Sequence, residues 1–242
     1  MKLFLAGSGH SKIWLEKKFY NFYRLQTFYH ISKEEAEVIH KYKGFLLDSG
    51  AFSMFGGLKV DIKDYVEKYI DFINKYNVEH FFELDIYEII GVKETEDLRK
   101  HIEEKTNKKT IPVWHIYLGV DYYKKLCKEY NYIAIGASGQ HDSGWTRKRP
   151  EKLKKLVEYA NSKKVRVHGL GYTLQKGLKE IPFYSVDSMT WLSGNRFGAV
   201  NEFKDKQMFK YDKPKGMRVK THLAVQNNFN EWVKYQIYLE TI

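Results

Sequence analysis

Eight short apolar runs recur along this 242-residue chain, each about as long as a β-strand. β-Branched and aromatic residues fill most of them, a composition typical of strands. The runs cover residues 2–6, 26–31, 44–48, 80–85, 112–116, 132–137, 165–170 and 183–187.

The segments between these runs carry apolar residues at helical spacing. In 61–76 the spaced residues are Tyr65, Tyr69, Phe72, Ile73 and Tyr76. The same spacing predicts helices over 94–106, 121–130 and 149–162, and a last one over 226–239. Strands that alternate with helices predict a parallel sheet.

Eight strand units in about 250 residues predict a (β/α)8 barrel, with residues 1–242 as a single domain. An open, doubly wound sheet is the alternative architecture. The barrel is favoured because a glycine or a polar residue follows nearly every strand, and in a barrel these ends meet at one mouth. These residues are Gly7, His30, Asp48, Asp85, His115, Gly136, Gly171 and Asp187. We expect residues 195–242 to be a C-terminal extension, with a basic loop over 195–217 and a helix that closes the barrel.

The net charge of +11 indicates a polyanionic partner, most simply nucleic acid. The alternative is the composition of an AT-rich genome, because Lys greatly outnumbers Arg. One basic cluster holds Arg147, Lys148 and Arg149, and a second runs through 204–220. The lysines at 152–155 fit a solvated helix face equally well.

Cys127 is the only cysteine, which excludes intramolecular disulfides and a cysteine-rich zinc site. We therefore expect a reducing compartment, the cytoplasm. No apolar stretch approaches the roughly 20 residues that span a bilayer, and 3–6 is too short for a secretion signal, so we expect no membrane partner.

Two distant apolar runs end in Asp-Ser, at Asp48-Ser49 and Asp187-Ser188. Carboxylates at the carboxyl ends of barrel strands are placed for catalysis, and two of them can act as nucleophile and general acid/base. Gly50 would let a ligand approach the backbone closely. The alternative for Asp48 is a side-chain cap of the next turn.

The segment 47–52, Leu-Asp-Ser-Gly-Ala-Phe, resembles the Asp-Ser-Gly-Gly-Phe signature of the tRNA-guanine transglycosylases. Four further blocks follow in the family's order. Residues 82–85 resemble the strand with the base-recognising Asp, and 132–139 the strand whose glycine-rich end lies against the base. Residues 167–171 resemble the Gly-x-Gly strand end, and 183–187 the strand of the nucleophile.

The departures from this pattern point to a subgroup. The zinc site of the tRNA enzymes needs several cysteines, and the base-reading Gln is not evident in 113–116. The tail 188–198 is more similar to the short phage-type (DpdA-like) DNA-guanine transglycosylases. The resemblance therefore implies DNA and a 7-deazaguanine base such as preQ0 as partners, no cofactor, and, for a phage gene, the host cytoplasm.

The resemblance also implies roles for single residues. Asp187 would be the nucleophile and Asp48 the general acid/base. The base would lie against Ser49, Gly50, Phe52, Asp85, His115, Gly136, Ala137, Ser138, Gly169 and Gly171. Nucleic acid would contact Arg147, Lys148, Arg149, Trp191 and Arg196, with Tyr117 and Tyr172 as further stacking candidates. His115 is open to a purely structural reading as well.

Three other functions stay open at this point. A tRNA-guanine transglycosylase-like enzyme would act on RNA. A metal-dependent barrel hydrolase would use the His and Asp residues at the strand ends as ligands. A basic barrel could also bind nucleic acid without catalysis. The resemblance favours exchange of guanine in DNA, and the oligomeric state does not follow from the sequence.

Overall fold

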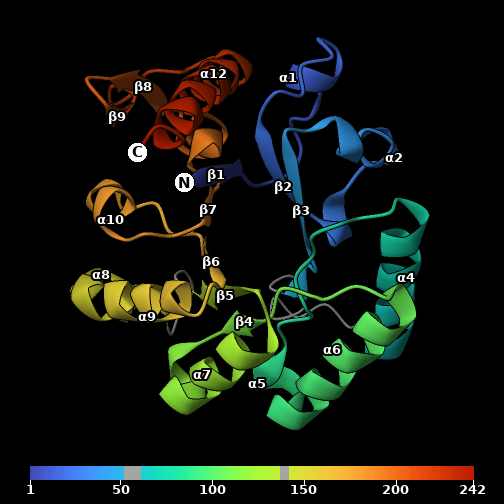
Figure 1. Cartoon of the computed structure of the whole chain (residues 1–242). Helices are drawn as coiled ribbons and strands as arrows, with labels where there is room; N and C mark the ends of the chain where they lie inside the picture. The colour runs from blue at the N-terminus through green and yellow to red at the C-terminus, as the bar shows by residue number, and fades with distance from the viewer. Residues whose placement is uncertain (52–60, 137–141) are drawn as a thin grey trace.

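Helices surround a curled sheet of parallel strands, which confirms the mixed α/β class (Figure 1). The computed structural model describes residues 1–51, 61–136 and 142–242. The described sheet has seven parallel strands in the spatial order β3-β2-β1-β7-β6-β5-β4. They are β1 (Lys2–Leu5), β2 (Tyr23–Thr27), β3 (Gly44–Asp48), β4 (Val113–Trp114), β5 (Tyr132–Gly136), β6 (Arg166–Leu170) and β7 (Ser185–Ser188).

Helices connect the strands and cover the outside of the sheet (Figure 1). The longer ones are α4 (Ile62–Lys75), α6 (Val92–Thr106), α7 (Gly119–Glu129), α9 (Pro150–Ser162) and α12 (Thr221–Leu239). The shorter ones are α1 (Lys12–Leu15), α2 (Lys33–Ala36), α5 (Tyr87–Ile90), α8 (Asp142–Lys148), α10 (Gln175–Glu180) and α11 (Ser193–Phe197). The 3-10 turns are η1 (Phe28–His30), η2 (Ile39–Lys41), η3 (Ile116–Leu118) and η4 (Thr190–Leu192). The helices predicted from spacing are thus confirmed, although α12 begins five residues earlier than expected.

The strands assigned in the described chain do not close a barrel, because the predicted strand over 80–85 is reduced to two bridging residues. Phe81 pairs with Leu47 of β3, and Phe82 pairs with Ile111 just before β4. Beyond them the Glu83 carboxylate accepts the Val113 N–H at 2.6 Å. A side chain therefore takes the place of a backbone partner, so the strand ladder ends there while the chain still crosses from β3 to β4.

The buried side chains form layers on the two faces of the sheet. The inner face carries Phe4, Tyr23, Leu25, Leu46, Phe82, Ile111, Val113, Tyr132 and Ala134. The outer face packs against the helices, with Leu3, Trp114, Ile135 and Val186 in one cluster and Leu47 and Phe81 in another. Alternate residues of one strand thus fall in different layers, as the two-residue period of a strand requires.

Residues 26–31 do not form the predicted strand. The strand is β2, which begins at Tyr23, and residues 28–30 form the turn η1. The error arose because β2 contains two buried polar residues. Arg24 donates to Glu35 at 2.7 Å, and Gln26 donates to the other oxygen of Glu35 at 3.0 Å. This paired group is hidden from a reading based on apolar runs.

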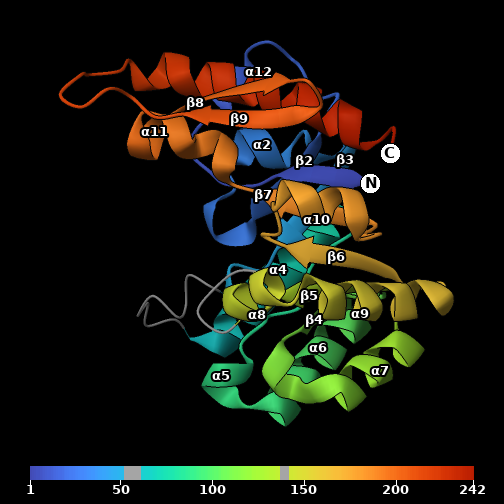
Figure 2. The ribbon, with the colours of Figure 1, turned by 90° about the vertical axis from the view of Figure 1, so that its left-hand side faces the viewer.

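Residues 195–217 are not simply a loop, since they contain the antiparallel hairpin β8 (Val200–Lys204) and β9 (Gln207–Tyr211). Its turn residues Asp205 and Lys206 both have positive φ, at 51° and 61°, as a tight two-residue hairpin loop requires. The hairpin packs on α12 through Asn201, whose carbonyl and amide groups are hydrogen-bonded to that helix (Figure 2). Helix α12 also lies against β1, where Gln236 donates to the Leu3 carbonyl at 2.5 Å.

Candidate active site

The alternation of the strands turns the two key carboxylates towards the inside of the sheet. Leu46 lies in the inner layer and Leu47 in the outer one, so Asp48 faces inwards. Val186 lies in the outer layer, so Asp187 on β7 also faces inwards. Because all strands of the sheet are parallel, their carboxyl ends lie at one edge. Both carboxylates therefore stand at the same end of the molecule.

Asp48 lies within electrostatic reach of two other carboxylates. Asp48 is partly exposed to solvent as a whole residue, but surrounding protein atoms bury its carboxyl group. The pKa of Asp48 is raised to about 6, mainly by burial and also by the charges of Asp187 and Asp85, whereas the N–H of Gly50 opposes this rise. A carboxyl group with this pKa exchanges protons near neutral pH, which general acid/base catalysis requires.

The Asp187 carboxylate is held through one of its two oxygens. His168 Nε2 lies 3.2 Å from Oδ1, and the Gly171 N–H donates to the same oxygen at 2.7 Å. The side chain of Asp187 is 10% exposed, whereas that of His168 is fully buried. Among the described residues no hydrogen bond goes to Oδ2. These contacts therefore hold the carboxylate through Oδ1 and leave Oδ2 without a donor from the described residues.

A buried chain of hydrogen bonds continues behind His168. Its Nδ1 lies 2.7 Å from Ser185 Oγ, which in turn lies 2.6 Å from the Tyr132 hydroxyl. Burial raises the pKa of Tyr132, so this hydroxyl keeps its proton and can donate to Ser185. In that direction the Ser185 hydroxyl can donate to Nδ1 of His168, and the Nε2 side of the ring faces Asp187. The chain thus fixes the orientation of the His168 ring.

Asp85 and His115 form a second pair at the same edge, because Asp85 follows the bridging segment and His115 follows β4. The His115 Nε2 lies 2.8 Å from Asp85 Oδ2, and both side chains are partly exposed, at 16% and 23%. The ring of Tyr117 is stacked on His115 at 5.3 Å, with 10° between the planes. Glu83 anchors the Asp85 segment, since it also accepts from Tyr87 at 2.7 Å and Arg99 at 3.1 Å.

The glycines of the predicted site differ in what they do. Gly50 has φ +82° and Gly171 has φ +65°, the left-handed region that favours glycine. The first lies next to Asp48, and the second aims its N–H at Asp187. Gly136 ends β5 and is buried. Gly169 packs 3.1 Å from Phe183 and Tyr172, measured from the position of an added Cβ, and its predicted contact with a base gains no support.

Two aromatic residues do not have the predicted role. Trp191 is fully buried, and its Nε1 donates to the Ala6 carbonyl at 2.7 Å, so the prediction that it contacts nucleic acid is wrong. Tyr172 is 2% exposed and is equally unable to stack on a base. Both residues are large and apolar enough to complete the core. The predicted contacts Phe52, Ala137 and Ser138 lie outside the described residues.

The remaining predicted residues differ in their exposure to solvent. Ser49 is buried behind Asp48, and its carbonyl accepts from the Tyr65 hydroxyl at 2.6 Å. Arg147 and Lys148 end α8, and Arg149 follows them, all exposed. Arg196 is exposed on α11, which begins five residues after Ser188 of β7.

No group of three metal-ligating side chains occurs in the parts of the chain that the structure describes. None of the described helices has both the length and the apolar character needed to cross a membrane.

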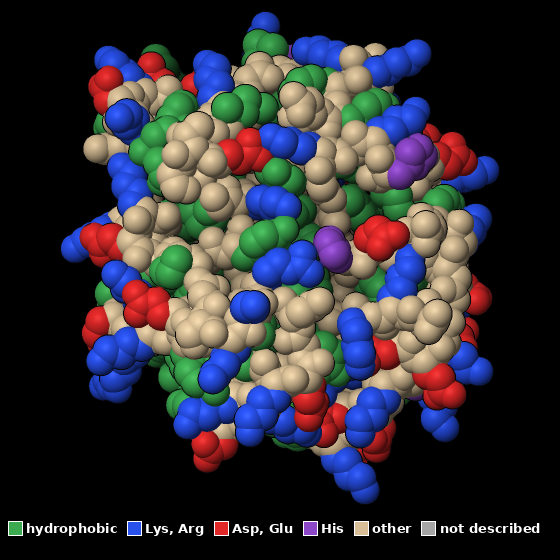
Figure 3. Space-filling view, viewed as in Figure 1, with side chains coloured by type: hydrophobic (Ala, Val, Ile, Leu, Met, Phe, Trp, Pro, Cys, Tyr) green, Lys and Arg blue, Asp and Glu red, His purple; other side chains and the backbone are tan. Residues whose placement is uncertain are grey.

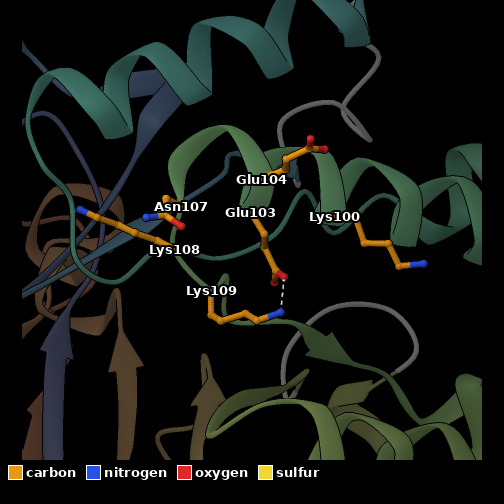
Figure 4. Close-up of a pocket in the computed structure, with 6 residues that line it drawn as sticks. All are labelled: Lys100, Glu103, Glu104, Asn107, Lys108 and Lys109. Atoms are coloured by element: carbon orange, nitrogen blue, oxygen red, sulfur yellow. Dashed lines mark hydrogen bonds and ion pairs between the residues drawn. The ribbon is translucent and has the colours of Figure 1, made fainter.

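A hollow of about 480 Å³ lies at the end of α6 (Figure 4). The chain runs from there to the start of β4, so the hollow lies away from the carboxylates at the strand ends. It is lined by Lys100, Glu103, Glu104, Asn107, Lys108 and Lys109.

Sequence reasoning gave Ser185 and Tyr132 no role behind the carboxylates, and it considered His168 only as a metal ligand of the alternative hydrolase. His168 lies two residues before the end of β6 at Leu170, Ser185 lies two residues before Asp187 on β7, and Tyr132 is the first residue of β5. The sequence signal that could have identified them was a polar side chain at an inward-facing position of a strand.

No model of a known protein family matches the chain, and no curated protein sequence matches it either.

Proposed function

We propose that this chain exchanges guanine in DNA for a 7-deazaguanine such as preQ0, through a covalent enzyme–sugar intermediate. The supporting observation is the convergence of three carboxylates at the carboxyl ends of parallel strands. The pKa of Asp48 is raised by burial and by the charges of Asp187 and Asp85, so these groups share one site. The resemblance of five ordered blocks of sequence to guanine transglycosylases supplies the choice of reaction.

In the first step Asp187 Oδ2 attacks C1′ of the target nucleotide. The new C1′–O bond forms while the C1′–N9 bond breaks, and its electron pair leaves with guanine. Asp48 donates a proton to the departing base. His168 and the Gly171 N–H hold Oδ1, which keeps the attacking oxygen in position.

In the second step the 7-deazaguanine gives its N9 proton to Asp48 and attacks C1′. The ester bond to Asp187 breaks, and the enzyme returns to its starting state. Two inversions at C1′ retain the configuration, the same logic that retaining glycosidases follow with paired carboxylates. Asp85, oriented by His115, accepts hydrogen bonds from the amino edge of the base.

The proposal includes a finer view of the fold, in which residues 80–85 serve as the eighth strand of a (β/α)8 barrel. Backbone hydrogen bonds support this view. The Phe82 N–H donates to Leu47 at 2.9 Å, and the Ile111 N–H donates to Phe81 at 2.8 Å. Backbone hydrogen bonds therefore continue from β3 through residues 81–82 to Ile111, just before β4. Asp85 follows this segment at the carboxyl ends of the strands.

The test is incorporation of radiolabelled preQ0 into DNA and, in parallel, into RNA of the same sequence. We expect label in DNA, loss of label with Asp187→Asn, and no covalent adduct with that variant. Asp64→Asn is the matched control, because Asp64 is 58% exposed and lies on the outer helix α4. Its activity should equal that of the unchanged chain.

The outcomes separate the alternatives. Label in RNA alone would replace DNA as the substrate. No label in either nucleic acid with any 7-deazapurine would overturn base exchange. Full activity of Asp187→Asn would remove Asp187 as nucleophile.

A further inference from the structure

The C-terminal part of the chain carries exposed aromatic rings among basic side chains. We call this the hairpin surface and define it by residues of α11, of β9 and of the segment that follows β9. They are Arg196, Phe197, Lys210, Tyr211, Lys213 and Arg218. Phe197 is 64% exposed and Tyr211 52%, values that a core or rim position does not explain.

These residues lie together although they are distant in sequence. Lys210 Nζ lies 5.9 Å from the centre of the Phe197 ring. Tyr211 pairs with Val200 across the hairpin, next to α11. Lys213 lies against Gly198, 2.9 Å from the position of an added Cβ. The basic side chains and Phe197 thus gather at one end of the hairpin, where Lys210 also pairs with Asp212 at 2.8 Å. Tyr211 is the next residue of β9 and leaves the other face of the hairpin, where its hydroxyl donates to Glu202 at 2.9 Å.

The charge of this region is strongly positive. Residues 195–220 hold eight Lys or Arg and three Asp or Glu, a net charge of +5 of the +11 in the whole chain. The opposite face, at the amino ends of the strands, shows basic and acidic side chains mixed (Figure 3). The hairpin surface therefore has the charge that attracts phosphates.

The hairpin surface lies on the side of the candidate active site. The turn η4 leads directly from β7, which carries Asp187, to α11. Gln175, in the segment after β6, exchanges two hydrogen bonds with Met208 of β9, at 2.6 and 2.9 Å. Figure 2 accordingly shows α11 and the β9–α12 connection on the side opposite the N-terminus, where the strands of the sheet end.

We propose that the hairpin surface binds an unpaired nucleic-acid strand beside the carboxylates, with Phe197 and Tyr211 stacked on bases and the cations on phosphates. Exposed rings favour this form, because the bases of a duplex are stacked on one another and offer no free faces. The inference adds to the proposed function, because it names the form of nucleic acid that reaches the carboxylates. Only this link to the carboxylates rests on the proposed function, and the binding of the strand does not.

The experiment measures binding of a fluorescent 20-nucleotide DNA strand and of the same sequence as a duplex, by anisotropy over a range of salt. The Asp187→Asn chain is used as well, so that binding is read without chemistry. We expect the single strand to bind more tightly than the duplex. Phe197→Leu with Tyr211→Leu should raise Kd for the single strand about tenfold or more, and Tyr211→Phe should not.

The charged variant tests the interaction with phosphates. Lys213→Ala with Arg218→Ala should lower the slope of log K against log salt by about 0.7 for each phosphate of a single strand that is no longer neutralised. The matched control is Lys100→Ala with Lys124→Ala, which removes two cations that are 69% and 49% exposed on the outer helices. This control should leave Kd nearly unchanged.

Several results would overturn the inference. One is equal or tighter binding of the duplex, and another is an equally large rise in Kd with the control pair. A third is a change in sedimentation with Phe197→Leu and Tyr211→Leu at unchanged Kd, which would make the surface an interface between two copies of the chain. Normal strand binding without base exchange would overturn the proposed function alone.

Discussion

The raised pKa of Asp48 predicts that this residue destabilises the fold at neutral pH. The folded protein holds the proton of Asp48 up to about pH 6, whereas the ordinary value is 3.8. Between these two pH values the folded state binds more protons than the unfolded state, so the free energy of unfolding falls as the pH rises. Above pH 6 the full cost of ionising the buried group is present.

The magnitude follows from the same two pKa values. At 1.36 kcal/mol per unit, a rise from 3.8 to about 6 corresponds to about 3 kcal/mol. Asp48→Asn removes the charge and retains an oxygen that can accept from Gly50. We therefore expect this variant to be more stable by about 3 kcal/mol at pH 8 and by only about 1 kcal/mol at pH 4.5.

The assay is urea unfolding of both proteins at pH 4.5, 6 and 8, followed by circular dichroism. Asp64→Asn is the control, because its partner Lys68 is exposed and the pair contributes less than about 1 kcal/mol. A stability difference for Asp48→Asn that is constant across this pH range, or that shrinks as the pH rises, would refute the reasoning. The carboxyl would then be well solvated and not coupled to Asp187.

Three further predictions concern the residues behind the site. Glu35→Gln leaves the buried Arg24 charge without its partner and should cost about 3–5 kcal/mol in urea unfolding. Gly171→Ala places a side chain at φ +65° and should cost about 1–2 kcal/mol, while it slows base exchange. His168→Asn should lower the rate of base exchange about 100-fold at unchanged KM, because Asp187 loses its orientation.

Each of these has a distinct contrary result. A stability loss under about 1 kcal/mol for Glu35→Gln would mean that water reaches Arg24. Unchanged stability of Gly171→Ala would show that the turn adopts another backbone conformation. A raised KM with an unchanged rate for His168→Asn would make this residue part of substrate binding, and not of the positioning of Asp187.

The sequence was sufficient for the parts of the fold that follow from apolar periodicity. The runs at 44–48 and 183–187 appear as β3 and β7, the latter shifted by one or two residues, and each delivers its aspartate inwards. The pattern failed where polar residues are buried in pairs. The charged residue Arg24 interrupts the apolar pattern of β2, and the Glu83 carboxylate accepts the Val113 N–H where the strand pairing stops. In both cases the partner lies in another segment of the chain, which apolar periodicity does not identify.

The candidate site was predictable to the same extent. Asp48, Asp85 and Asp187 were found because they end apolar runs. The contact between His168 and Ser185 was not predicted, since it requires the register of β6 against β7. Trp191 was misjudged because sequence does not distinguish a ring that faces solvent from one that fills the core.

The junction at Glu83 has a consequence for how the wall of the sheet comes apart. Between β3 and β4 only a few backbone bonds are shared, and the Val113 amide depends on a carboxylate whose pKa is raised to about 7, mainly by burial. Native-state hydrogen exchange should find its least protected seam here, with the Val113 amide exchanging faster than those of Ile133 and Val167 in the neighbouring ladders. Local opening of the sheet would then be centred on this junction, where the chain runs on to Asp85.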